Sequence, residues 1–164
     1  MSFVLALVDV GATLEEATGL FQYLLVFLFA AIPVIEILVV IPIGIGVGLH
    51  PVTTGAVAFA GNVLSVGLLV VFQRRITTWW LARGDGSPRG GRVGRARRLW
   101  DRYGVPALGF GGPVLTGVHV AALVALLAGS RPRTVVAWMT VGIAVWTVIL
   151  VVASVTGLSL LGIQ

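Results

Sequence analysis

The chain has 164 residues, of which 58% are hydrophobic and only 10% are charged. Soluble domains have roughly 25% charged residues, so this composition excludes a water-soluble globular protein and predicts an all-α integral membrane protein, built as one domain over residues 1–164. Cysteine is absent, which excludes disulfides, thiolate metal sites and thiol nucleophiles.

Residues 1–19 form an acidic N-terminal segment. It contains Asp9, Glu15 and Glu16 and no basic residue. A secretory signal peptide starts with positive charge, so this segment does not have the pattern of a cleavable signal. We therefore expect the first apolar segment to stay in the mature protein, and the N-terminus to lie outside the cell.

Prolines and glycines interrupt the apolar segment from Leu20 to His50. Pro33 and Pro42 each remove a backbone donor and clash with the preceding helical turn, and Gly44 follows closely. Lipid tolerates such backbone only where protein or water surrounds it, so a re-entrant hairpin is predicted here. The alternative is that these residues only kink helices or allow close packing. Residues 51–72 follow as a full crossing and complete the first half, residues 20–72.

Glu36 is the only acidic residue inside the apolar blocks. An ionised carboxylate in hydrocarbon costs at least ~2.5 kcal/mol on insertion scales. A carboxyl group at this depth is therefore predicted to have a function, and one that gains and loses a proton can couple substrate movement to a proton gradient. The alternative is that Glu36 lies at a shallower depth.

Residues 73–103 form an arginine-rich segment with nine Arg and two Asp, a net charge of 9 − 2 = +7. Arg-rich short loops stay in the cytoplasm, so this segment is predicted to be cytoplasmic. Residues 92–104 have the spacing of an interfacial amphipathic helix. Its arginines are candidate ligands of anionic lipid headgroups; they are Arg92, Arg95, Arg97 and Arg98. The alternative is a solvated loop without a specific lipid.

The second half, residues 104–164, has the same interrupted character, with Pro106, Pro113 and several glycines. Two arms of about 12 residues, each ~18 Å long, would reach the bilayer midplane and return. A hairpin over residues 103–130 keeps the arginines at 131 and 133 in the cytoplasm, and residues 134–158 then cross once. Four plain crossings with both termini inside are the alternative.

A short internal repeat flanks the arginine-rich segment. The sequences PVTTG at 51–55 and PVLTG at 113–117 match at four of five positions, which is compatible with the structural repeats of transporters. His119 follows the second copy and is the candidate partner of Glu36. Asn62 and Thr116 are candidates to bind substrate, or to satisfy backbone groups and neighbouring helices.

The run IPVIEILVVIPIGIGVGLHPVTTGAVAFAGN, with YGVPALGFGGPVLTG in the second half, resembles the small multidrug export family over residues 30–157. That family is similar to DedA-like membrane proteins, which implies re-entrant hairpins and movement of lipids or proton coupling. The resemblance carries these motif residues over: Pro33, Glu36, Pro42, Gly44, Gly61, Asn62, Pro113, Thr116 and Gly117. Two positions depart from the family pattern, because Leu38 replaces a basic residue and His119 an aromatic one.

A secondary exporter of small amphipathic or hydrophobic compounds in the cell membrane, coupled to protons, is the predicted function. A DedA-like lipid carrier and a structural subunit without transport activity are the alternatives. No catalytic constellation is recognisable, so we expect no enzyme activity and no cofactor or metal. Predicted partners are the bilayer, anionic headgroups, a substrate and a second copy of the chain, and nucleic acid is not expected.

Overall fold

The computed structural model describes residues 2–33, 35–82, 91–160 and 162, without the side chains of 2–8, 73–74, 76–82 and 91–97. Every regular element in these ranges is an α-helix, as the composition predicted. The chain forms two compact units: unit 1 contains Met1–Asn62 and Ala144–Gln164, and unit 2 contains Val63–Ile143. The two longest helices therefore contribute one end to each unit.

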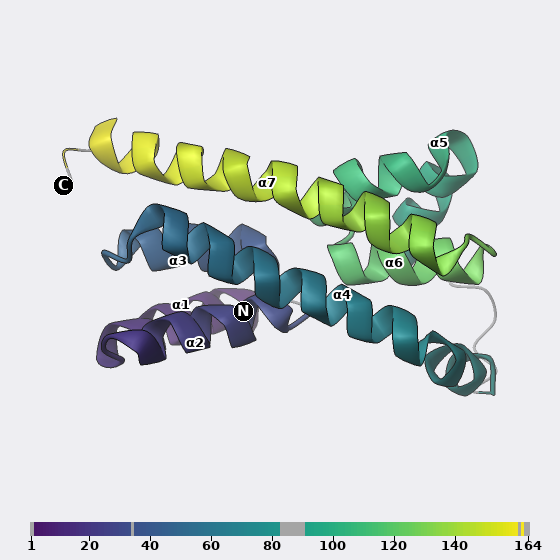
Figure 1. The fold of residues 1–164 in the computed structure, drawn as a ribbon, viewed down its shortest axis with the longest axis horizontal. Helices are drawn as coiled ribbons and strands as arrows, with labels where there is room; N and C mark the ends of the chain where they lie inside the picture. Colours follow the sequence, from purple (N-terminus) through teal and green to yellow (C-terminus); the bar gives the residue numbers. More distant parts are fainter. Residues whose placement is uncertain (1, 34, 83–90, 161, 163–164) are drawn as a thin grey trace. The chain divides into compact units, whose positions relative to one another are not determined.

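Unit 1 is built around a helical hairpin (Figure 1). Its arms are α2, Leu20–Ala31, and α3, Glu36–Gly46, and the first helix, α1, Ser2–Glu16, packs on both. The Gln22 side chain donates a hydrogen bond to the carbonyl of Leu14 at 2.9 Å, which fastens α2 to α1. The acidic N-terminal segment is therefore largely a helix with its own buried face.

Unit 2 contains a second helical hairpin. Its first arm belongs to α5, Gly91–Leu115, which Gly104 divides into 91–103 and 105–115 because its backbone is not helical (φ 71°, ψ −162°). Its second arm is α6, Val118–Leu127, which packs against α5. A helix was predicted at residues 92–104, and the helix observed at residues 91–103 confirms it. The position of this helix at a membrane interface stays a prediction.

Two long helices follow the hairpins. They are α4, Pro51–Ala82, and α7, Pro132–Leu160, and each begins with a proline, whose missing N–H costs nothing at the first helical position. The segment Pro51–Phe72 and the whole of α7 are long and apolar enough to cross a membrane. The predicted crossings at 51–72 and 134–158 are thus helices, while α2, α3 and α6 have only 10–12 residues.

Proline and glycine unwind less of the backbone than the sequence suggested. Helix α3 continues through Pro42 and Gly44 to Gly46, because a proline removes a single donor and leaves the other helical hydrogen bonds in place. Gly44 instead allows close packing, since a Cβ there would lie 2.9 Å from Cγ2 of Thr54. Among the described residues of the two hairpins, the helices are interrupted only at the tips, at residues 32, 33 and 35 and at residues 116–117.

Candidate functional site

Glu36 lies at the tip of the first hairpin and is only 4% exposed. It is the first residue of α3, and its N–H donates to the carbonyl of Ile32 at 3.2 Å. Its φ of 47° is the only positive φ among the non-glycine residues that the structure describes. A side chain in this region usually costs about 1–3 kcal/mol and persists where the surroundings or a function require it.

Glu36 and Asn62 are both buried side chains of unit 1. Helices α3 and α4 run antiparallel because the short turn at 47–50 joins them, and Gly44 packs against Thr54. Glu36 precedes Gly44 by eight residues and Asn62 follows Thr54 by eight, a rise of about 12 Å along each helix. All four residues lie on the buried faces of their helices. The count predicts that the carboxyl and amide groups lie at similar distances from the turn between α3 and α4.

Asn62 has no exposed surface, and neither its Nδ2 nor its Oδ1 has a hydrogen-bond partner. The preceding residue, Gly61, lies against the backbone carbonyl of Phe27, so α4 and α2 approach without an intervening side chain. Native proteins pair nearly all buried polar atoms, and an unpaired amide marks a place for a ligand, a water or an ion. We therefore include Asn62 in the candidate site.

Replacing Asn62 by leucine, which has a similar shape, is expected to raise the thermal unfolding midpoint of the protein in detergent. The substitution removes two unpaired buried polar atoms, whose desolvation costs about 1–3 kcal/mol. Thr54→Val is the control, because the Thr54 hydroxyl donates to the carbonyl of His50 at 3.0 Å and its loss should lower the midpoint. A lower midpoint for Asn62→Leu would show that the amide is bonded in the native protein.

The predicted site residues of the second half gather around the tip of the second hairpin. Thr116 is 2% exposed and donates to the carbonyls of Gly112 and Gly117, both at 3.3 Å, as its alternative role of satisfying the backbone predicted. Gly117 has a φ of 88° and precedes α6. Pro113 is buried inside α5.

His119 is buried on α6, and its Nε2 lies 2.7 Å from Oγ of Ser65. It belongs to unit 2 and Glu36 to unit 1, so the pairing of these two side chains stays a prediction. Ser65 was not singled out in the sequence, since one serine on an apolar helix, 54 positions from His119, carries no signal of this contact.

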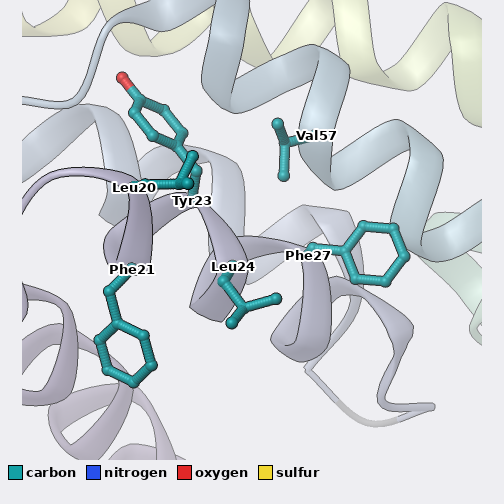
Figure 2. A pocket seen from close by; sticks show the side chains of 6 residues that line it. All are labelled: Leu20, Phe21, Tyr23, Leu24, Phe27 and Val57. Carbon is teal, nitrogen blue, oxygen red and sulfur yellow. The ribbon is translucent and has the colours of Figure 1, made fainter.

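An apolar groove of about 620 Å³ lies between α2 and α4 in unit 1 (Figure 2). Three aromatic and three aliphatic side chains line it: Leu20, Phe21, Tyr23, Leu24, Phe27 and Val57. The only polar atom on these side chains is the Tyr23 hydroxyl oxygen, which accepts a hydrogen bond from the His50 N–H at 3.3 Å. This volume is within the range of small-molecule sites, and no motif in the sequence predicted the groove.

The other predicted residues are only partly placed. Pro33 lies in the exposed tip of the first hairpin, and Pro42 is half-buried. Of the predicted headgroup ligands, Arg98 is exposed, while the side chains of Arg92, Arg95 and Arg97 lie outside the described residues. No group of three or more His, Asp or Glu side chains gathers into a metal site within the described part of the chain.

Comparison with known proteins gives one family. The model of a family described as "Putative small multi-drug export protein" matches residues 36–149, which include Glu36, the second hairpin tip, all of α4 and more than half of α7. No curated protein and no solved structure gives a significant match. Two long apolar helices and this match together indicate a membrane protein of the export class. The match covers more than half of the chain, and the chain therefore belongs to the small multidrug export family.

Proposed function

We propose that the chain is a proton-coupled exporter of small amphipathic or hydrophobic compounds and that Glu36 binds the coupling proton. One observation carries the proposal: a carboxyl group is 4% exposed at a hairpin tip, in a backbone conformation that glycine adopts more easily. Neither the burial of position 36 nor its positive φ favours glutamate, so we infer that the carboxyl group is present for its ability to bind a proton.

The hairpin geometry supports a position of Glu36 deep in the bilayer. Helix α2 has 12 residues and α3 has 11, which gives arms of about 16–18 Å against a hydrocarbon thickness of about 30 Å. In the proposed arrangement each hairpin enters the membrane and returns, and its tip lies near the midplane. The apolar groove between α2 and α4 then receives the substrate, since its lining suits uncharged and aromatic groups.

Asn62 is proposed as the fixed polar group of the same site. Its amide both donates and accepts, so it can bind a substrate hydroxyl or carboxamide or a water molecule beside the carboxyl group. Binding of anionic headgroups by the arginines of residues 92–98, and assembly of two copies of the chain, are part of this proposal. The hairpin arms need protein around them in lipid, which a second copy would supply.

The test is transport in liposomes that contain the purified protein. Rhodamine 6G trapped inside should leave faster when the outside is acidic, and Glu36→Gln should remove at least about 90% of this proton-dependent rate, since the variant keeps the shape and loses the titration. The control is Glu16→Gln, at an exposed position of α1, which should transport at the normal rate.

A second measurement on the same liposomes follows the flipping of a headgroup-labelled phosphatidylserine. Flipping without dye efflux would replace the exporter with a lipid carrier. Dye efflux by Glu36→Gln at the normal proton-dependent rate would remove Glu36 from the mechanism.

A further inference from the structure

The two halves of the chain contain the same turn between a hairpin and its long helix. In the first half the N–H groups of Val47 and Leu49 donate to carbonyls four and five residues earlier, at 2.9 and 3.0 Å. In the second half Ala128 and Ser130 make the same bonds with the same lengths. The residue between each pair is a glycine, with φ of 91° at Gly48 and 88° at Gly129. Each residue of the second turn therefore lies 81 positions after its counterpart in the first turn (128 − 47 = 81 and 130 − 49 = 81).

The long helices follow the same correspondence. Five buried positions of α4 have buried counterparts 81 residues later on α7. The pairs are Thr54 and Val135, Ala58 and Met139, Gly61 and Gly142, Asn62 and Ile143, and Val66 and Thr147. The paired glycines also have equivalent neighbours. Gly61 lies against the backbone carbonyl of Phe27 in α2, and Gly142 lies against the backbone carbonyl of Gly109 in α5, so each glycine contacts the first arm of the preceding hairpin. The correspondence thus includes packing as well as hydrogen bonds.

The hairpin tips match in sequence with a difference of 80, one less than in the turns and long helices. The sequence PVIE at 33–36 matches PVLT at 113–116. The N–H of Glu36 donates to Ile32 at 3.2 Å, and that of Thr116 donates to Gly112 at 3.0 Å. Both side chains are buried, at 4% and 2% exposure. The positive φ that Glu36 adopts in the first tip is found in the second tip at Gly117, the residue after Thr116.

From these correspondences we infer that Thr116 is the equivalent of Glu36 in a second copy of one hairpin-and-helix unit, and that the second tip is a matched site able to hold a protonated carboxyl group. The inference rests on the proposed role of Glu36 as the proton-binding residue. In this arrangement transport depends on one protonatable hairpin tip per chain, that of Glu36, because the threonine at the second tip does not titrate in the physiological range.

The hydrogen bonds of Thr116 show what the second tip accepts. Its hydroxyl donates to the carbonyls of Gly112 and Gly117, both at 3.3 Å. A side chain at this position therefore faces hydrogen-bond acceptors. A protonated carboxyl group can donate to one of these carbonyls, whereas a carboxylate can only accept. A carboxyl group introduced at position 116 should therefore hold its proton.

The experiment labels the full-length protein in detergent with dicyclohexylcarbodiimide, an apolar reagent that reacts with protonated carboxyl groups, and locates the adducts by peptide mass spectrometry. The wild-type protein should carry one adduct at Glu36, and Glu36→Gln should carry none. Glu36→Gln combined with Thr116→Glu should regain one adduct at position 116. Labelling of Glu15 and Glu16, at exposed positions of α1, gives the background of the measurement.

The outcomes separate the two claims. An adduct at Glu36 of the wild type but none at position 116 of the folded double variant would overturn the equivalence and leave the proposed function intact. A wild-type protein without an adduct at Glu36 would overturn both. If the glutamate variant does not fold, Thr116→Asp gives the same comparison, because the aspartate side chain is shorter and has nearly the volume of threonine.

Discussion

Glycine in place of Glu36 is expected to give a more stable protein than alanine in the same place. At an ordinary helical position alanine is better by about 1 kcal/mol. At a φ of 47° the order reverses, because glycine adopts positive φ without a steric penalty and alanine pays about 1–2 kcal/mol. Both substitutions remove the same carboxyl group, so the difference between them isolates the backbone conformation.

The measurement is the thermal unfolding midpoint of both variants in the same detergent, together with proton-dependent efflux from liposomes. Both variants should lose at least about 90% of the coupled efflux, since neither can bind a proton at position 36. Ala60→Gly, at an exposed position of α4, is the control and should lower the midpoint. A midpoint that is higher for Glu36→Ala than for Glu36→Gly would show that the backbone at the tip is relaxed.

Alanine at Gly142 or Gly61 is expected to prevent correct packing of the unit concerned. A Cβ at Gly142 would overlap the carbonyl of Gly109, and one at Gly61 would overlap the carbonyl of Phe27. Backbone atoms of a packed helix cannot turn away as a side chain can, so each substitution should cost about 3 kcal/mol or more. We expect little or no folded protein after size-exclusion chromatography in detergent.

The matched controls are Gly67→Ala on α4 and Gly157→Ala on α7, because nothing lies within 4 Å of a Cβ at either position. These variants should fold and gain up to about 1 kcal/mol, as expected for alanine inside a helix. Normal folding of Gly142→Ala would mean that α5 and α7 are farther apart than the structure has them.

The sequence predicted the helical class and both long helices, because an uninterrupted apolar run of 20 or more residues has few other structures available. It also predicted a functional carboxyl group at Glu36; this residue is buried in the protein, and its depth in the bilayer stays a prediction. Helix α1 was not predicted, although Val10 and Leu14 are buried four residues apart, as expected for one face of a helix. Its signal was therefore present in the sequence.

Other features were not accessible from the sequence. A proline shows that a donor is missing, but it does not show whether a helix ends there, and α3 continues through Pro42. The positive φ of Glu36 has no compositional signal, since glutamate rarely adopts it. The repeat that the sequence suggested paired residues 51–55 with 113–117, yet Pro51 begins α4 and Pro113 lies inside α5. The hydrogen bonds of the turns were needed to find the register with a difference of 81.

The apolar segments of the two long helices differ in length, which affects how the protein fits its lipid. At 1.5 Å per residue the 22-residue segment Pro51–Phe72 is about 33 Å long and matches a hydrocarbon layer of about 30 Å when nearly upright. The 29 residues of α7 extend about 43 Å. In the proposed arrangement this helix tilts strongly or extends its last turns, with Thr156 and Ser159, among the headgroups, and thicker membranes relieve the mismatch.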